Sequence, residues 1–212
     1  MSLDLHLDLA PWREHLTSLR DDIPGLVPVA KGNGYGYGLA RLADEARRLG
    51  VDTLAVGTAR EIPAVRAGGW HGDVVVLAPW DHRDPDAVAA LADDHVITTI
   101  ARLDDLGRVA RQYPGARVLV EALTSMRRHG LDRDDIARVR NLSSGLEIEG
   151  WTIHLPLRGN VLLEARQLAG IAVACLEAPV WISHLSPEQY RSFSDELSVP
   201  TRLRLGTQLW LG

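Results

Sequence analysis

The stretch VPVAKGNGYGYGLARLADEARRLGVDTLAV, residues 27–56, contains the unit from which the fold can be predicted. An apolar run at 27–30 leads into a glycine-rich loop, then into apolar residues at helical spacing over 39–50 and a second apolar run at 53–56. Short apolar runs rich in β-branched residues are typical of buried strands, and a spacing of three and four residues is typical of an amphipathic helix. The stretch therefore predicts a strand, a helix and a second strand.

This unit recurs to the end of the chain. The strand candidates are VPVA at 27–30, TLAV at 53–56, VVVL at 74–77, VITTI at 96–100, ARVLV at 116–120, LEIEGWTI at 146–153, PVWI at 179–182 and RLRL at 202–205. The helix candidates between them are 39–50, 59–69, 84–94, 101–113, 132–142, 162–176 and 186–197. Strands that are apolar on both faces are typical of a parallel sheet covered by helices.

Eight such units predict an α/β fold, a closed (β/α)8 barrel of the TIM type. The main alternative is an open doubly wound sheet, which has the same alternation, but no reversal of strand order is evident. We expect one domain over 1–212, with an extra strand and helix within 1–25. LDLHLDL at 3–9 alternates like a strand, and PWREHLTSLRDD at 11–22 has helical spacing. That first strand has no evident partner in a lone barrel and would form an exposed edge.

The bulk composition excludes several classes of protein. With 212 residues and 46% hydrophobic content, the chain is long enough for one substantial core. Its formal net charge of -5 gives no basic surplus for nucleic acid. No apolar run approaches the ~20 residues that span a bilayer, and the first residues lack the charged head and apolar body of a signal peptide. We therefore expect a cytoplasmic protein that binds neither nucleic acid nor a membrane.

The cysteine and the histidines indicate neither a disulfide framework nor a metal site. Cys175 is the single cysteine and lies in an apolar stretch, which is typical of a buried small side chain. No zinc-type spacing is found among the histidines, which are His6, His15, His71, His82, His95, His129, His154 and His184. We expect no bound metal.

The loop at 31–38 is the strongest candidate for chemistry. Active sites of such barrels are built from the loops after the C-terminal ends of the strands, and Lys31 follows the first strand candidate. A lysine amine can form a Schiff base with a carbonyl compound. The glycines of GNGYGYG at 32–38 allow a close approach of the backbone to a ligand, and Tyr35 or Tyr37 can present a hydroxyl. The alternative is a surface lysine whose stem lies along apolar residues.

PVAKGNGYGYG at 28–38 resembles the cofactor-lysine motif of the alanine racemase family, in which the lysine is followed three residues later by Ala or Gly and then by Tyr-Gly-x-Gly. Residues 40–69 are similar to the next helix, strand and helix of that family. The resemblance implies that the chain binds pyridoxal 5'-phosphate. It further implies that Lys31 forms the internal aldimine and acts as the base on one face of the substrate α-carbon. Tyr35 would contact the phosphate.

VLVEALTSMRRHGL at 118–131 resembles the region of the family's fifth strand. There, Arg128 takes the place of an arginine beside the cofactor and the substrate carboxylate. The matching positions are Thr124, Met126 and Gly130, and the departures are Glu121, Leu123 and Ser125. Glu121 replaces a lysine that is often carbamylated, and its carboxylate could supply a similar negative charge to orient the arginine.

Three later segments complete the site that the resemblance implies. His154, at the end of the sixth strand candidate, corresponds to a histidine near the cofactor ring. Phosphate would bind at Ser183, with Ser186 as the alternative, and at the backbone of Gly206 and Thr207. Arg204 matches an arginine that donates to the pyridine nitrogen. Because a guanidinium only donates, that nitrogen would be unprotonated, which suits proton removal and return better than transamination or decarboxylation.

The sequence leaves three functional hypotheses. The first is an amino-acid racemase acting on a small amino acid, with alanine as the substrate that the resemblance implies. Racemisation needs acid-base groups on both faces of the α-carbon. Alanine racemases take the second, a tyrosine, from a C-terminal domain of the partner subunit. Residues 1–212 contain nothing that resembles that domain, so we expect either a fragment of a longer racemase or a barrel-only relative. A homodimer and impaired activity are further expectations. The second hypothesis is a non-catalytic carrier of pyridoxal phosphate, and the third is a barrel in which Lys31 is structural.

Overall fold

The computed structural model describes residues 6–212. Within these residues the strands are β1 (Leu26–Pro28), β2 (Thr53–Val56), β3 (Asp73–Pro79), β4 (Val96–Ile100), β5 (Arg117–Ala122), β6 (Glu147–His154), β7 (Val180–Ser183) and β8 (Thr201–Leu205). The α-helices are α1 (Leu9–Asp22), α2 (Leu39–Leu49), α3 (Ile62–Ala67), α4 (Pro85–Ala90), α5 (Leu103–Gln112), α6 (Arg133–Ile136), α7 (Val139–Leu142), α8 (Val161–Cys175), α9 (Pro187–Asp195) and α10 (Thr207–Leu211). Two 3-10 helices are η1 (Gly34–Gly36) and η2 (Ala59–Glu61).

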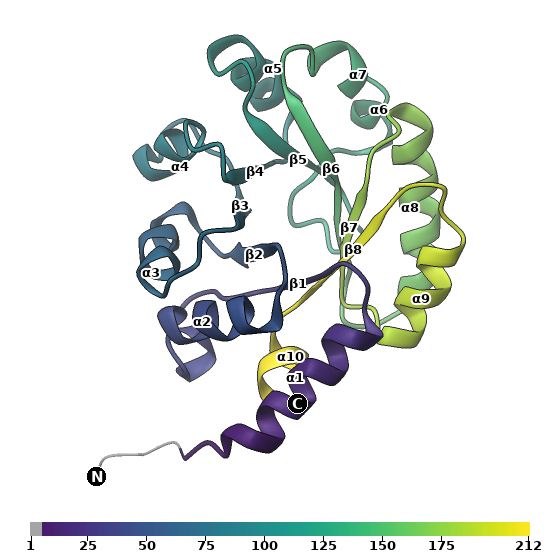
Figure 1. Ribbon diagram of the computed structural model, residues 1–212. Helices are drawn as coiled ribbons and strands as arrows, with labels where there is room; N and C mark the ends of the chain where they lie inside the picture. The colour runs from purple at the N-terminus through teal and green to yellow at the C-terminus, as the bar shows by residue number, and fades with distance from the viewer. Residues whose placement is uncertain (1–5) are drawn as a thin grey trace.

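The strands form one parallel sheet in the order β1-β8-β7-β6-β5-β4-β3-β2. Its two outer strands, β1 and β2, meet through a single parallel bridge between Val29 and Ala55. Sequential neighbours in this order and a meeting of the two ends define a nearly closed α/β barrel of the TIM type, in one domain (Figure 1). The predicted fold class is confirmed, and the doubly wound alternative is excluded.

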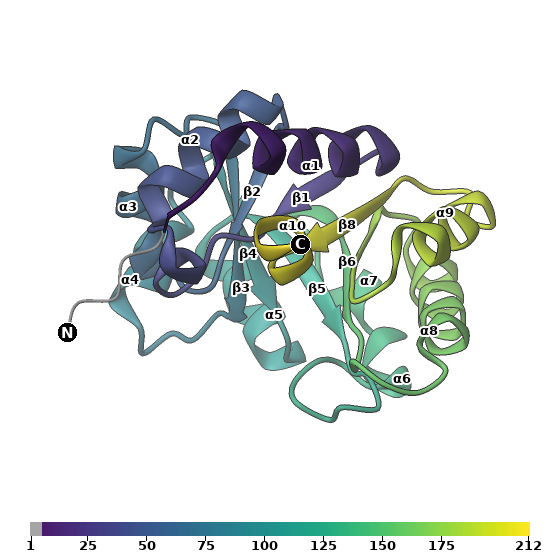
Figure 2. The same ribbon diagram turned by 90° about the horizontal axis from the view of Figure 1, so that it is seen from below.

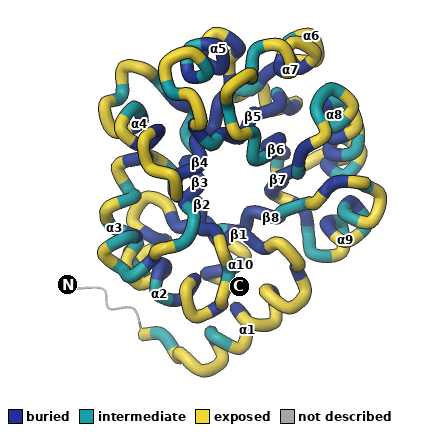
Figure 3. The backbone as a smooth tube through the Cα atoms, turned by 45° about the horizontal axis from the view of Figure 1, so that its top comes forward, coloured by how far each residue is buried: buried dark blue, intermediate teal, exposed yellow. Residues whose placement is uncertain are grey.

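The core has two layers because each strand is apolar on both faces. The inner layer fills the barrel and is formed by Val27, Val29, Ala55, Val75, Ile97, Leu119 and Trp181. The larger outer layer lies between the strands and the surrounding helices. Figure 3 shows the ring of buried strands inside helices whose outer faces are exposed. Packed side chains therefore fill the barrel, and a ligand must bind at an end.

Local sequence signals explain where the helices begin and end. Gly50 ends α2 in the left-handed conformation, with φ of 70°. Ser186 caps α9 by accepting a hydrogen bond from Gln189 N, and Pro187 occupies the first turn. The helices predicted over 59–69 and 132–142 are each divided into two short helices. The periodicity of the apolar residues thus locates these two helical segments but not the break within each of them.

The two ends of the described chain pack together on the outside of β1. The strand predicted at 3–9 lies partly on residues 1–5, which are outside the described residues; His6–Asp8 form no strand, and α1 begins at Leu9 because Asp8 accepts from Ala10 N. The sequence did not predict α10, which lies beside α1 in Figures 1 and 2. Trp12 Nε1 donates to the carbonyl of Trp210 (2.9 Å), and Trp210 Nε1 donates to the carbonyl of Val29 (2.8 Å). The last turn of the chain therefore supports the strand that leads to Lys31.

Over residues 6–212, none of the helices combines the length and the apolar composition that a membrane crossing requires.

Candidate active site

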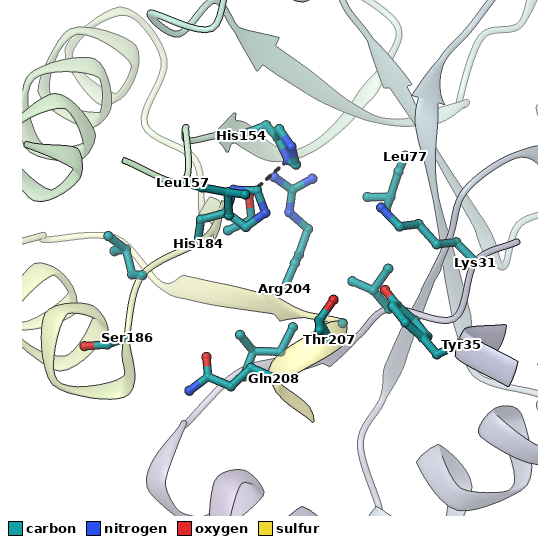
Figure 4. Close-up of a pocket in the computed structure, with 15 residues that line it drawn as sticks. Lys31, Tyr35, Leu77, His154, Leu157, His184, Ser186, Arg204, Thr207 and Gln208 are labelled. Carbon is teal, nitrogen blue, oxygen red and sulfur yellow. Dashed lines mark hydrogen bonds between the residues drawn. The ribbon is translucent and has the colours of Figure 1, made fainter. Parts of the chain in front are cut away.

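A cavity of about 390 Å³ lies at the C-terminal ends of the strands. Its walls come mainly from the segments that follow β1, β6, β7 and β8 (Figure 4). The predicted site residues that line it are Lys31, Tyr35, His154, Ser183, Arg204, Gly206 and Thr207. Residues that are up to 176 positions apart in the sequence thus meet around one space, while Arg128 is not part of this lining.

Lys31 directly follows the point where β1 meets β2. The backbone on one side is fixed because Ala30 N donates to the carbonyl of Ala55 (2.8 Å), and on the other because Gly34 N donates to the carbonyl of Lys31 (3.0 Å). In Figure 4 the side chain extends into the cavity, with its amine near Leu77. Lys31 is also the one lysine in the whole sequence. Any chemistry of a lysine amine in this chain therefore takes place at this cavity.

Tyr35 is held against Gly206 by an unusual backbone conformation. Its φ is 55°, and Gly34 and Gly36 on either side also have positive φ. A Cβ at Gly206 would lie 2.0 Å from the Tyr35 hydroxyl oxygen, so only glycine leaves room for this hydroxyl. Burial raises the pKa of Tyr35. The phenol therefore keeps its proton at neutral pH and can donate a hydrogen bond to a ligand.

His154 and Ser183 form a polar pair on neighbouring strands. The His154 Nδ1 atom lies 3.0 Å from Ser183 Oγ, in agreement with the register of β6 and β7, which places the two residues side by side. Burial, together with the positive charges of Arg204 and Arg128, lowers the pKa of His154 to about 3. The imidazole is therefore neutral at physiological pH.

Arg204 is a buried cation at the floor of the cavity. Its Nη2 atom donates to the carbonyl of Ile153 (3.1 Å), and its Nε atom is buried without a hydrogen-bond partner among residues 6–212. Burial lowers the pKa of Arg204 to about 10, against the opposing effect of the Glu121 carboxylate, so the guanidinium stays charged at neutral pH. A guanidinium with an unpaired N–H can donate a hydrogen bond to a ligand atom that carries a lone pair.

His184 lines the same cavity, although sequence reasoning did not assign it a role. Its φ is 66°, a conformation that is uncommon for a residue other than glycine. Its Nδ1 atom lies 2.5 Å from the carbonyl of Leu155, and its ring packs edge-on against His154 with centroids 4.6 Å apart. Burial lowers the pKa of His184. The position of His184 next to Ser183, after a strand, is the signal that could have identified it.

The hydroxyl of Ser183 is better placed for a ligand than that of Ser186. Ser186 Oγ accepts from Gln189 N (3.2 Å) and donates to the Glu188 carboxylate (2.8 Å) as part of the start of α9. Figure 4 shows Ser186 at the edge of the cavity, turned away from Lys31. The choice of Ser183 as the phosphate contact remains a prediction, and the geometry favours it over Ser186.

Arg128 and Glu121 are arranged differently from the sequence expectation. Arg128 is exposed, and Glu121 is buried with only 3% of its surface accessible. The Glu121 Oε2 atom lies 2.6 Å from His129 Nδ1, although their orientation is outside that of a hydrogen bond. We describe the pair as a close electrostatic contact. The near partner of Glu121 is thus His129, and the predicted role of Arg128 beside a substrate carboxylate stays a prediction.

The described part of the chain contains no group of three or more histidine, cysteine, aspartate or glutamate side chains that could hold a metal ion. The polar side-chain groups around the cavity are instead one amine, one guanidinium, one carboxamide, hydroxyls and two imidazoles. This set is suited to an organic ligand with anionic and acceptor groups.

A family model described as "Alanine racemase, N-terminal domain" matches residues 7–183. The chain therefore belongs to the family of alanine racemase N-terminal domains, and the resemblance first noted around Lys31 is confirmed. The match ends before β8, so Arg204, Gly206 and Thr207 lie beyond it.

Individual relatives agree with this assignment. The alanine racemase of Desulfovibrio desulfuricans is 29% identical over 158 residues, which cover 70% of this chain and 42% of that protein. The alanine racemase of Nitrosococcus oceani is 31% identical over 159 residues, which cover 70% of this chain and 43% of that protein. The crystal structure of alanine racemase from Corynebacterium glutamicum has a TM-score of 0.77 and 18% identity, over 96% of this chain and 60% of that one. The matched region thus spans less than half the length of these two curated relatives.

Proposed function

We propose that this chain is the cofactor-binding barrel of an amino-acid racemase, with pyridoxal 5'-phosphate held at Lys31 and alanine as the substrate. The observation that carries the proposal is that the chain's one lysine extends into a cavity that Tyr35, Ser183 and Arg204 also line. Alanine as the substrate is supported by the names of the relatives. The homodimer and the cytoplasmic location expected from the sequence remain predictions.

The donor set fits the polar groups of pyridoxal phosphate. An aldehyde needs an amine, which Lys31 supplies. A phosphate needs several hydrogen-bond donors, and Tyr35, Ser183 and the segment Gly206–Thr207 can provide hydroxyl and N–H groups. A pyridine nitrogen needs a donor, and Arg204 has a buried N–H to which the described part of the chain offers no partner. The assignment is thus consistent with an unsatisfied atom as well as with the family.

Each of these residues has a defined task in racemisation. Bound pyridoxal phosphate supplies an electron sink that acidifies the α-proton of an amino acid. Lys31 would remove or return that proton with its amine, on the face of the substrate that it approaches. Arg204 keeps its proton at neutral pH because its pKa is about 10, and would therefore hold a ring nitrogen through a hydrogen bond without protonating it. Such an arrangement suits reversible proton transfer.

The neutral imidazoles limit the positive charge of the cavity. His154 would otherwise add a cation next to Arg204 and Lys31, and its pKa of about 3 shows that it does not do so at neutral pH. The neutral ring can form a hydrogen bond at one nitrogen while Ser183 Oγ contacts the other, Nδ1. We therefore assign His154 a place beside the cofactor ring, where it contacts Ser183.

The test is an absorbance titration of the protein with pyridoxal phosphate, run beside the variant Lys31→Ala. The wild type should develop a band near the ~420 nm expected for a cofactor bound to a lysine amine, and borohydride should fix it at Lys31. Lys31→Ala should give only the spectrum of the free cofactor. Absence of the band in the wild type would contradict the proposal.

A second measurement separates a racemase from a carrier. Incubation of the loaded protein with L-alanine in D2O should replace the α-proton by deuterium and produce D-alanine, which NMR and a chiral assay detect. Cofactor binding without exchange of the α-proton would favour the alternative, a non-catalytic carrier of pyridoxal phosphate. The matched control is Leu163→Ala, which changes an exposed side chain of α8 outside the cavity lining.

A further inference from the structure

The junction between β1 and β2 is the weakest seam of the barrel. Every other neighbouring pair of strands shares at least three paired residues, while β1 and β2 share the single bridge between Val29 and Ala55. Lys31 lies two residues beyond that bridge. Without a further connection, the backbone that carries the amine would be held to its neighbour by little more than one hydrogen bond.

The carboxylate of Glu61 supplies this connection. Its Oε1 atom accepts from Gly32 N (2.8 Å), directly after Lys31, while its Oε2 atom accepts from Gly57 N (2.6 Å) and Thr58 N (3.3 Å), directly after β2. One oxygen thus binds each side of the seam. Among residues 6–212, no basic side chain forms an ion pair with Glu61, so its charge is stabilised by backbone N–H groups.

Gly57 shows how closely Glu61 and Lys31 are packed. A Cβ at Gly57 would lie 3.1 Å from Lys31 Cβ and 3.1 Å from Glu61 Oε2. Both contacts are tighter than ordinary van der Waals distances between such atoms. The absence of a side chain at Gly57 therefore lets the Lys31 stem and the Glu61 carboxylate lie against the same point of the chain, directly after β2.

The direction of a long side chain depends on the backbone from which it starts. Ala30 N donates to the carbonyl of Ala55, and Gly32 N donates to Glu61. Hydrogen bonds therefore hold the Val29–Ala30 peptide group before Lys31 and the Lys31–Gly32 peptide group directly after it. We propose that Glu61 is a positioning residue, whose carboxylate joins the two strands across the seam and holds Lys31 where its amine meets the cofactor. The role in cofactor binding rests on the proposed function. The hydrogen bonds of Glu61 to both sides of the seam are present without a cofactor.

The central variant is Glu61→Gln. A glutamine amide has one acceptor oxygen and places an NH2 group where the other carboxylate oxygen was, so either Gly32 N or the pair Gly57 N and Thr58 N loses its acceptor. Glu61→Asp keeps two oxygens but shortens the side chain by one methylene, so we expect a weaker effect of the same kind. The matched control is Asp84→Ala, which removes another carboxylate that accepts from two backbone N–H groups, at the start of α4 and away from the cavity.

The first readout needs no cofactor. Reductive methylation with 13C-formaldehyde modifies Lys31 and the N-terminal amine alone, because the chain has one lysine. In Glu61→Gln the NMR signal of the dimethylated Lys31 should shift toward that of free dimethyl-lysine, and the Gly32 amide should exchange about 10-fold faster. Both should stay at their wild-type values in Asp84→Ala. A Lys31 signal unchanged in Glu61→Gln and in Glu61→Asp would overturn the proposal.

The second readout is the rate at which pyridoxal phosphate attaches to Lys31, measured at 420 nm after melting curves have established that the variants are folded. Attachment should be about 10-fold slower in Glu61→Gln than in Asp84→Ala, and equal rates in the two variants would refute a positioning role. If the wild type takes up no cofactor, the proposed function fails, and the methyl signal of Lys31 alone decides whether Glu61 positions it.

Discussion

The contact between Gly206 and Tyr35 provides a test of whether the Tyr35 hydroxyl binds the cofactor phosphate. The test is the variant Gly206→Ala, which adds one methyl group at this contact. In Gly206→Ala the new Cβ would lie 2.0 Å from the Tyr35 hydroxyl oxygen and 3.0 Å from Cζ, while Val29 Cβ is 3.6 Å away. Gly206 has φ of -115°, so the substitution requires no left-handed backbone. The methyl group therefore acts on Tyr35.

The methyl group of Gly206→Ala should displace the Tyr35 hydroxyl oxygen far enough to break a hydrogen bond. Relief of the overlap requires the Tyr35 oxygen to retreat by roughly 1 Å or more, which stretches a bond of about 2.7 Å beyond hydrogen-bond range. A hydrogen bond to a charged group contributes about 1.5–3 kcal/mol, and each 1.4 kcal/mol is a factor of about 10 in affinity. We therefore expect Gly206→Ala to bind pyridoxal phosphate about 10- to 100-fold more weakly.

The assay compares pyridoxal phosphate with pyridoxal, which lacks the phosphate, by titration of the wild type, Gly206→Ala and Tyr35→Phe. Both variants should lose affinity for pyridoxal phosphate and retain most of their affinity for pyridoxal. In the double variant the loss should be smaller than the sum of the two single losses, because both act on the same hydroxyl. Equal losses for the two ligands, or an unchanged affinity for pyridoxal phosphate, would refute the reasoning.

Two further predictions concern stability. The His154 pKa of about 3 lies below the ~6.5 of an unfolded histidine, so the unfolded state binds the proton first as the pH falls. The stabilisation is fully present above about pH 6.5 and should decline by about 1–2 kcal/mol between pH 7 and pH 5 in urea titrations; a His154→Gln variant with the wild-type pH dependence would contradict this. Trp210→Phe removes the donor to the carbonyl of Val29 and should lower the free energy of unfolding by about 1–3 kcal/mol. Leu211→Ala, at an exposed position of the same helix, should change it by less than about 0.5 kcal/mol, and similar effects of the two variants would count against the hydrogen bond.

The sequence predicts the barrel well because its strands are buried on both faces. The strands expected at 53–56 and 96–100 have the same bounds in the structure, since every residue in them is buried and turn residues flank them. The helix α10 was missed because Leu209 and Trp210 are its only buried residues, too few to establish a periodicity. Its place is determined by long-range contacts with Val29 and Trp12, which no local pattern contains.

The sequence predicts those site residues that can be recognised by their type and their place at the end of a strand. Lys31, His154 and Arg204 each follow or end a strand, and the barrel brings such positions together. Glu61 and His184 were not assigned because their importance depends on which backbone groups they meet in three dimensions. The surroundings of Glu121 were not predictable either, since the neighbour His129 reaches it only through the fold of the loop after β5.

The partner of β1 has a consequence for how the protein is made. The strand that leads to Lys31 pairs along its length with β8, so that Val27 lies opposite Arg204, 177 residues later in the chain. During synthesis the amine therefore leaves the ribosome early, on a segment whose ladder partner has not yet been translated. Its edge stays open until β8 and the turn with Trp210 have been synthesised. A nascent chain that pauses before residue 200 would hold most of the barrel but no assembled cavity, so cofactor binding would report that β8 has been added to the sheet.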